Sequence, residues 1–437
     1  MSSDRNIELL ARIDALPAEV DSVNHSSSYL PFRNKDTVID FDKLAGHVIA
    51  TVSHTTIKPG EGLRSFRERA LKLMRTALAA DAPLELIDTA YLTGSCLQSI
   101  APEFAMMQEP GPKATEHLAQ AFRTLLWSDQ PVELSAPAGL NFVERRLLSL
   151  FQTDLLAKNS CPPTADCYLP FLRDACRKDL RFLLARPHYF STEKRRFLEL
   201  YAFLYTSQLA LGLRAYGQLP QPRPLYFILD SEKASRDRSQ IVDNGYKSVR
   251  QAASRLFPIL SVLNYFNPSG GHQFPLWEYS GALVAAGAKR TRYEERLVVF
   301  AEAFRINRNL PERRREDPLD TLVDYSMEQF SKGQTREAMN TRYVREFEEH
   351  FASPFCENRG RSGAVLVMQQ DHLLLATNLC IGGDESVLFP ELVRRFESRG
   401  IFWDQDSQVE LVQFYRRVGN VKALSDTGEA VYVAKAI

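Results

Sequence analysis

The sequence predicts a mainly α-helical protein with few strands, which ends in a winged helix-turn-helix domain. Apolar residues recur at helical spacing along most of the middle of the chain. A single interior run, "PLYFILD" (224–230), has the aromatic and β-branched composition of a strand between polar boundaries. The C-terminal residues 363–437 follow the order strand, three helices and hairpin, which is typical of a winged helix.

The composition limits the classes of function. Hydrophobic residues make up 44% and charged residues 25% of the 437-residue chain, which favours a globular protein with a packed core. Lys+Arg and Asp+Glu number 54 each, so the net charge is zero. A protein that binds nucleic acid by itself usually has a basic excess. Any DNA contact is therefore expected at a local patch, or shared with a partner.

Neither the start of the chain nor its most apolar segment suggests a membrane protein. The N-terminal residues are charged throughout and lack the apolar core of a signal peptide. The most apolar window, residues 201–217, is too short for a span and contains Arg214. We expect a cytoplasmic protein without a membrane partner.

Three segments are predicted along the chain. Residues 1–27 contain one short amphipathic stretch and the polar run "DSVNHSSS", and are expected to form a flexible N-terminal arm. Residues 28–354 are expected to form a mainly helical body. The stretch "FCENRGRSG" (355–363) is the best candidate for a linker before the winged-helix domain at 363–437. The helical patterns of the body lie at 62–80, 114–128, 168–187, 194–217, 246–265 and 292–307.

The C-terminal segment begins with a predicted strand and two predicted helices. "GAVLVM" (363–368) has the composition of a strand, and the helix after it should stop at Gly382 and Gly383. In the second helix, Pro390 suits the first turn and Gly400 suits the position after the last turn.

The third predicted helix, "DSQVELVQFYRRVGN", precedes a hairpin. Ser407 and Glu410 match a capping box at its start. Its inner face is predicted to hold Leu411, Phe414, Tyr415 and Val418. The runs "NVKAL" and "EAVYV" would form the hairpin strands around the tip "SDTG".

The predicted winged helix has little positive charge for reading DNA. The outer face of its third helix would hold Val409, Gln413, Arg416 and Asn420, with Arg417 beside them, and Ser407 and Gln408 would lie at its N-terminus. Residues 391–437 contain seven basic and seven acidic residues, and the wing tip carries Asp426 and Glu429. Carboxylates at the tip disfavour contact with phosphates. The charge balance therefore favours a module that docks on protein.

One family resembles this sequence. "ELVRRFESRGIFWDQDSQVELVQFYRRVGNVKALSDTGEAVYV" (391–433) is similar to the C-terminal end of the DptG (DndG) family, DNA phosphorothioation-dependent restriction proteins of bacteria. "SYLPFRNKD", "DFDKLAGHVIA" and "PLYFILDSEKAS" resemble further landmarks of that family. The resemblance implies a subunit that works beside DptF-like and DptH-like ATPases in a complex that damages DNA lacking the sulfur mark. It supplies no catalytic residue.

The chain contains no complete catalytic or metal-binding motif. It has no GxxxxGK[ST] and no HExxH, and the spacing of Cys161, Cys167 and Cys176 does not match a zinc site. We therefore expect no catalytic residue, no metal and no cofactor. One stretch leaves a nuclease open: Asp230 follows the predicted strand, with Glu232 and Lys233 after it, although the usual carboxylate-x-Lys on a neighbouring strand is missing.

Two basic regions are candidate DNA-binding surfaces. Arg173, Arg177 and Arg181 are spaced four residues apart, within a segment (172–197) that has eight basic and three acidic residues. Residues 281–316 contain nine basic and five acidic residues, including Arg313, Arg314 and Arg315. These surfaces suit a DNA backbone or an acidic partner. Pairing with acidic residues from other segments is the alternative that remains open.

The sequence thus predicts a non-catalytic subunit of a phosphorothioation-dependent restriction complex. It would bridge DptF-like and DptH-like ATPase subunits, with double-stranded DNA as a further candidate partner. The candidate DNA-binding residues are Arg173, Arg177, Arg181, Arg313, Arg314, Arg315, Arg416 and Arg417. A divergent metal-dependent nuclease and a winged-helix DNA-binding regulator are the alternatives.

Overall fold

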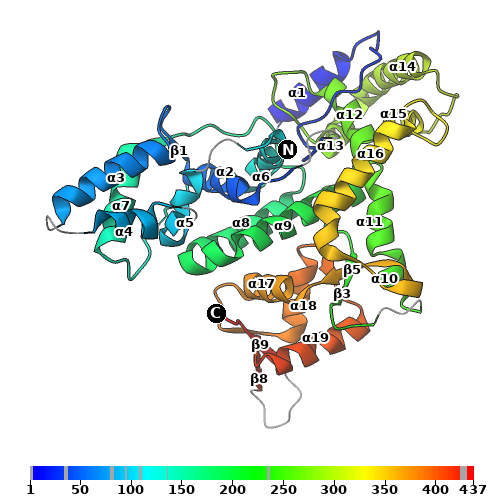
Figure 1. Cartoon of the computed structure of the whole chain (residues 1–437). Helices are drawn as coiled ribbons and strands as arrows, with labels where there is room; N and C mark the ends of the chain where they lie inside the picture. The colour runs from blue at the N-terminus through cyan, green and yellow to red at the C-terminus, as the bar shows by residue number, and fades with distance from the viewer. Residues whose placement is uncertain are drawn as a thin grey trace.

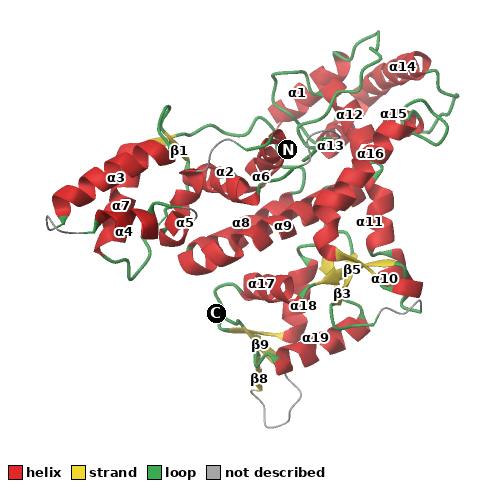
Figure 2. Ribbon diagram, viewed as in Figure 1, coloured by secondary structure: helices red, strands yellow, loops and turns green. Residues whose placement is uncertain are grey.

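A computed structural model describes residues 3–33, 38–78, 83–93, 96–107, 111–134, 136–233, 237–423 and 431–437 (Figure 1). The predicted mainly helical class is confirmed, with 61% helix and 8% strand (Figure 2). The helix α9 (Pro187–Gly212) lies at the centre, and its residues from Phe197 to Ala210 are almost all buried. In this part of α9, apolar side chains point in all directions around the helix axis, so the helix packs against neighbours on every side.

The N-terminal residues are packed against the body, where the sequence predicts a flexible arm. Helix α1 (Ser3–Asp14) buries Leu9 and Ile13 completely. Arg5 donates two hydrogen bonds to the carboxylate of Glu278, at 2.6 and 2.8 Å. The short amphipathic stretch is therefore a core-facing helix, held by one apolar stripe and a bidentate ion pair.

A second, smaller core lies in the N-terminal third, at the left of Figure 1. Phe66, Phe104 and Phe151 form its aromatic centre, with ring centroids 4.8 to 5.9 Å apart. The elements of this third are α2 (Phe41–Ser53), β1 (Thr55–Ile57), α3 (Leu63–Ala77), α4 (Leu84–Tyr91), α5 (Cys96–Ile100), α6 (Lys113–Leu126), α7 (Phe142–Leu150) and β2 (Leu156–Lys158). Strands β1 and β2 pair antiparallel.

Helices before and after the single interior strand complete the body. Helix α8 packs against α6 and α9, and α14 against α15. Their bounds are α8 (Pro170–Leu184), α10 (Ser239–Asp243), α11 (Tyr246–Ala253), α12 (Leu256–Phe266), α13 (Leu276–Ala285), α14 (Arg290–Arg308), α15 (Pro318–Glu328) and α16 (Glu337–Phe347).

The main sheet crosses the predicted domain boundary. Its order is β4-β5-β3-β7, with the bounds β3 (Leu225–Leu229), β4 (Cys356–Asn358), β5 (Ala364–Met368) and β7 (Ile401–Phe402). Strand β3, predicted at 224–230, pairs parallel with both β5 and β7, while β4 runs antiparallel to β5. The stretch predicted as a linker, 355–363, thus contains an edge strand and joins two parts of one sheet.

Both faces of this sheet are covered by helices. Ile228, Val365 and Val367 face Ile241 of α10. Phe227, Leu366 and Met368 on the other face belong to the main core, which runs from Leu9 to Val433. Burial on both faces explains why β3 and β5 are continuous apolar runs instead of alternating ones.

The C-terminal helices lead into a second sheet of three strands, β6-β9-β8, in which neighbours pair antiparallel. The elements are α17 (Gln370–Ile381), β6 (Ser386–Leu388), α18 (Phe389–Glu397), α19 (Gln405–Arg417), β8 (Val421–Ala423) and β9 (Val431–Ala434). The predicted wing tip, with Asp426 and Glu429, lies outside the described residues.

The start of α19 differs from the predicted capping box. Asp404 is the N-cap residue, and its side chain accepts a hydrogen bond from the backbone N–H of Ser407 at 3.0 Å. Ser407 lies one turn inside the helix and is fully buried. Leu411, Phe414 and Tyr415 are buried as predicted, and Val418 is half-buried.

Across the described ranges, no helix combines the length and the apolar character that a membrane span requires.

Candidate nucleic-acid interface

Helix α8 presents the predicted arginine stripe on its outer side. Pro170 begins the helix, where its missing backbone N–H costs no hydrogen bond, because the first N–H groups of a helix have no partner within the helix. Leu172, Cys176 and Leu183 are completely buried on the inner side. Arg173 and Arg177 are half-buried, and Arg181 is exposed. The local amphipathic pattern therefore places the three guanidinium groups along one edge of the helix.

The positive charge of this stripe is poorly compensated. Arg173 lies 3.1 Å from the carboxylate of Asp174, a residue that is itself largely exposed. Arg177 and Arg181 form no ion pair within the described part of the chain. The Nε atom of Arg177 is buried and has no hydrogen-bond partner there. Burial, together with the nearby Arg173 and Arg181, lowers the pKa of Arg177. An anion placed here would relieve the repulsion between like charges.

The arginines at 313–315 are instead neutralised by acidic neighbours. Arg313 lies 3.3 Å from Glu328, and Arg314 lies 3.0 Å from Glu312. Arg315 lies 2.7 Å from Asp324. For this region, which is the loop between α14 and α15, pairing with acidic residues describes the geometry better than a free cationic patch.

The two arginines of α19 are exposed near the end of that helix. Arg416 and Arg417 form no ion pair with any described residue. Val409 is 61% exposed and Gln413 is exposed, as predicted for the outer face. Asn420 was predicted on this face but is buried at 7% exposure, because Ala434 of β9 donates to its backbone oxygen at 2.7 Å.

The N-terminus of α19 is anchored on the main sheet. Ser407 Oγ lies 3.0 Å from Glu232 and 3.3 Å from the backbone oxygen of Phe227 in β3. Arg238 donates to Ser407 at 2.7 Å and also binds Asp404. Ser407 therefore cannot approach base edges as the sequence suggested, because that end of the helix is covered.

The two carboxylates of the nuclease alternative point to different partners. Glu232 is 6% exposed, accepts from the backbone N–H of Leu229 at 2.7 Å, and pairs with Arg238 at 2.7 Å. Asp230 is exposed and lies 3.3 Å from Arg359. Glu232 stabilises the end of β3 and already forms an ion pair with Arg238. Glu232 and Asp230 therefore do not form a site for a metal cation.

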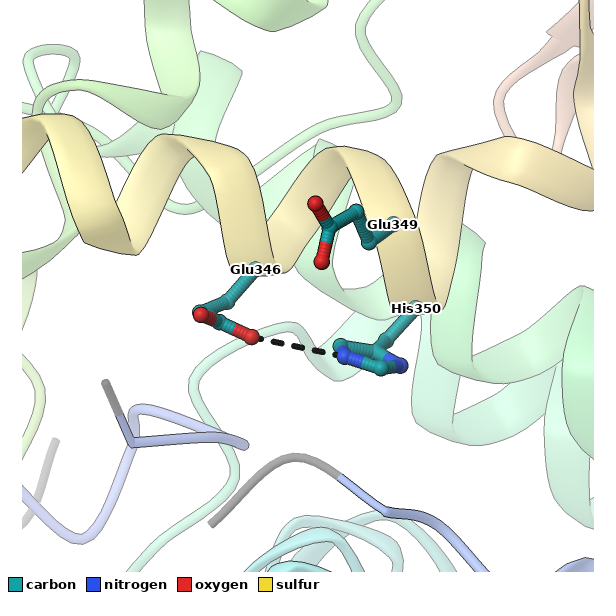
Figure 3. Close-up of side chains that lie close together, drawn as sticks. All are labelled: Glu346, Glu349 and His350. Atoms are coloured by element: carbon teal, nitrogen blue, oxygen red, sulfur yellow. Dashed lines mark ion pairs between the residues drawn. The ribbon is translucent and has the colours of Figure 1, made fainter. Parts of the chain in front are cut away.

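One group of possible metal ligands was not anticipated from the sequence. Oxygen and nitrogen atoms of Glu346, Glu349 and His350 lie within 4.8 Å of one another, at the end of α16 (Figure 3). His350 Nε2 is 3.3 Å from Glu346. The ExxEH spacing on a helix was the available signal. Arg345 lies 3.5 Å from Glu346 and 3.7 Å from Glu349, and it already offsets part of their charge.

Comparisons with known proteins add no relative. Neither a scan against protein-family models nor a search of curated proteins found a match to this chain. These comparisons therefore assign no function to the chain.

Proposed function

We propose that the chain is a non-catalytic subunit of a bacterial DNA phosphorothioation-dependent restriction complex. It binds DNA through the arginine stripe of α8 and joins DptF-like and DptH-like ATPase subunits. The observation that carries the DNA contact is the unpaired state of Arg177 and Arg181 among the described residues. The restriction role rests on the resemblance of residues 391–433 to the DptG family.

The geometry of the stripe suits a phosphate backbone. Residues four apart on an α-helix rise about 6 Å along its axis. Arg173, Arg177 and Arg181 therefore offer three planar, permanently charged donors in a row. Arginine donors of this kind bind phosphate oxygens without reading the base sequence. A chain with zero net charge can bind DNA in this way only where the local charge is uncompensated.

We infer further that the predicted winged-helix domain at 363–437 docks on protein. Its support is the order α17, β6, α18, α19, β8, β9 and the sheet order β6-β9-β8. The buried N-terminus of α19 argues against base reading by that end. Its exposed face, with Val409, Gln413 and Arg416, is available to a partner subunit. A complex acting on chromosomal or phage DNA would work in the cytoplasm.

The test is a pull-down of the affinity-tagged full chain from its native host, followed by DNA-binding assays on the complex and on the chain alone. We expect the two ATPases to be retained, and we expect Arg177→Ala/Arg181→Ala to weaken duplex binding at least tenfold. Arg313→Ala/Arg314→Ala, which removes paired arginines, is the matched control and should bind as the native chain does. Loss of the ATPases from the eluate, or equal DNA binding by both double variants, would refute the proposal.

A further inference from the structure

A cavity of about 400 Å³ lies between α2, α6 and the segment 159–165. Its wall includes Trp127, which directly follows α6, and Asn159, which follows β2. Pockets of a few hundred Å³ accommodate small organic ligands. Nothing in the proposed function uses this cavity so far.

Two stacked rings, His54 and Trp127, form an aromatic platform, and Trp127 lines the cavity. The imidazole of His54 stacks on the indole of Trp127, with ring centroids 4.0 Å apart and an interplanar angle of 8°. His54 ends α2 in the left-handed conformation, with φ of 52°, and its backbone oxygen accepts from the N–H of Asn159 at 2.8 Å. Trp127 lines the cavity, and one face of its indole is covered by His54. The platform is held in place before any ligand arrives.

The rest of the wall offers hydrogen bonds without a net charge. Gln120 and Asn159 contribute amide groups. Arg123 and Glu116 carry opposite charges, and Arg123 is fixed by a 2.9 Å hydrogen bond to the backbone oxygen of Cys161. Desolvation, together with the nearby Arg123, lowers the pKa of His47, which disfavours a further positive charge on this wall. Such a wall suits an uncharged planar ring with polar edges better than it suits a phosphate group.

A second, small hollow connects the segment around Trp127 with the arginine stripe of α8. Leu126 and Ser128, the two neighbours of Trp127 in the chain, line a small hollow together with Arg177 and Arg181. Trp127 thus lines the cavity, while its two chain neighbours lie beside two uncompensated arginines. Basic grooves flanked by aromatic side chains are how many proteins hold single strands, since every base has a face that can stack.

We propose that this cavity takes a nucleobase and that, with Arg177 and Arg181 on the phosphates, it holds single-stranded DNA. The phosphate contacts of this site rest on the proposed function, whereas the base contact stands on Trp127 and the wall of the cavity. Base stacking on Trp127 adds affinity for a single strand that a closed duplex, whose bases are already stacked, cannot gain.

The experiment measures binding of the full chain to three probes: a fluorescent twelve-nucleotide single strand, a duplex of the same length, and adenosine. We expect Trp127→Leu to weaken binding of the single strand about tenfold and to leave duplex binding unchanged. Trp127→Phe, which keeps an aromatic face, should stay within about threefold of the native chain. Gln120→Ala/Asn159→Ala leaves the stack with His54 intact and should also weaken single-strand binding, which covers the case that Trp127→Leu fails to fold.

The outcomes separate this inference from the proposed function. Single-strand binding that is unchanged in both Trp127→Leu and Gln120→Ala/Asn159→Ala overturns the inference, even if Arg177→Ala/Arg181→Ala abolishes duplex binding and so supports the proposed function. Loss of single-strand binding in Trp127→Leu, with no effect of the arginine variant on either form of DNA, supports the base site and overturns the phosphate role. Loss of adenosine binding alone identifies a free nucleoside as the ligand and overturns the single-strand assignment.

Discussion

The guanidinium of Arg399 donates two hydrogen bonds to the carboxylate of Asp179, at 2.8 and 2.5 Å, across 220 residues of sequence. Asp179 is completely buried and Arg399 is 5% exposed. The hydroxyl of Tyr201 in α9 also donates to Asp179. This ion pair connects α8 of the body to the end of α18.

Removing one partner of this pair should strongly destabilise the protein. Asp179→Ala leaves a buried guanidinium without a counter-charge, and we expect the free energy of unfolding to fall by about 3 to 5 kcal/mol. The double variant Asp179→Leu/Arg399→Leu should recover most of this loss, because neither charge remains buried. Urea unfolding measures both. The control is Arg394→Ala, whose pair with Glu391 is exposed and should contribute less than about 1 kcal/mol. An Asp179→Ala variant as stable as this control would contradict the expectation.

Protonation of the carboxylate of Asp404 in acid should lower the free energy of unfolding of the protein. Burial raises the pKa of Asp404, but hydrogen bonds from Arg238 and from the backbone N–H of Ser407 outweigh it and hold the pKa below its usual range. A carboxyl group with a lowered pKa in the folded state contributes stability above its unfolded pKa of about 3.9, and this is lost as the pH falls through the folded value.

Asp404→Asn keeps a good N-cap residue but removes the negative charge. It therefore isolates the contribution of the charge to the free energy of unfolding. We expect a loss of about 1 to 3 kcal/mol at pH 7 that shrinks as the pH falls below about 4, the usual pKa of an aspartate. Chemical unfolding across this pH range provides the measurement. Asp406→Asn serves as control, because Asp406 is exposed and lies 3.7 Å from Arg238. A loss in Asp404→Asn that stays constant down to pH 2 would exclude this role for the charge.

Substitution of two glycines with positive φ distinguishes the cost of backbone strain from the cost of a steric clash. Gly400 has φ of 85° and Gly419 has φ of 76°. A methyl group on Gly400 would meet the side chain of Gln208, whereas nothing lies near Gly419. The Gln208 amide is held by hydrogen bonds of 2.8 Å to and from the backbone of Arg223.

Gly419→Ala should therefore show strain alone, about 1 kcal/mol, and Gly400→Ala should lose about 2 to 4 kcal/mol. Thermal and urea unfolding of the two variants report the difference. Equal losses would mean that Gln208 moves aside without penalty.

The arginine stripe predicts a specific salt dependence. Each phosphate contact contributes about 0.9 to the slope of log affinity against log salt concentration for duplex DNA. If Arg177 and Arg181 each neutralise one phosphate, the double alanine variant should reduce this slope by about two. Fluorescence anisotropy at several salt concentrations measures it. Arg313→Ala/Arg314→Ala should leave the slope unchanged, and a drop in affinity without a change in slope would place the contact elsewhere.

A substitution on the exposed face of α19 should impair assembly with partner subunits without changing the stability of the chain. Val409 is 61% exposed, so Val409→Asp should change the free energy of unfolding by less than about 0.5 kcal/mol. If α19 docks on a partner subunit, a carboxylate in the interface should reduce retention of the ATPases several-fold. If the Val409→Asp variant retained the ATPases as well as the native chain does, this face of α19 would not be part of the interface.

The sequence predicted local elements better than their partners. The run 224–230 identified β3 to within a residue at each end, because the strand signal is local. Its parallel partners β5 and β7 could not be inferred, since parallel strands are joined through long crossovers that leave no turn signal. The packing of α1 could not be inferred for the same reason, because the surface that buries Leu9 and Ile13 lies on α13 and α14, far along the chain.

Charged residues show the same limit at the candidate site. Arg177 and Arg315 look alike in the sequence, yet Arg315 lies 2.7 Å from Asp324 and Arg177 has no acidic partner among the described residues. Asp404 took the capping role predicted for Ser407, because the chain enters α19 three residues earlier than the pattern indicates. The stack of His54 on Trp127 depends on two helix ends meeting in space, which no spacing in the sequence indicates.

The position of β3 between β5 and β7 has a consequence for how the protein is made. On the ribosome, β3 emerges more than 130 residues before β5 and more than 170 before β7. At about 5 to 20 residues per second, an apolar strand waits for many seconds without its neighbours. The nascent chain therefore carries an unpaired strand through about a third of its synthesis, and truncation products that end before residue 364 should aggregate or recruit chaperones.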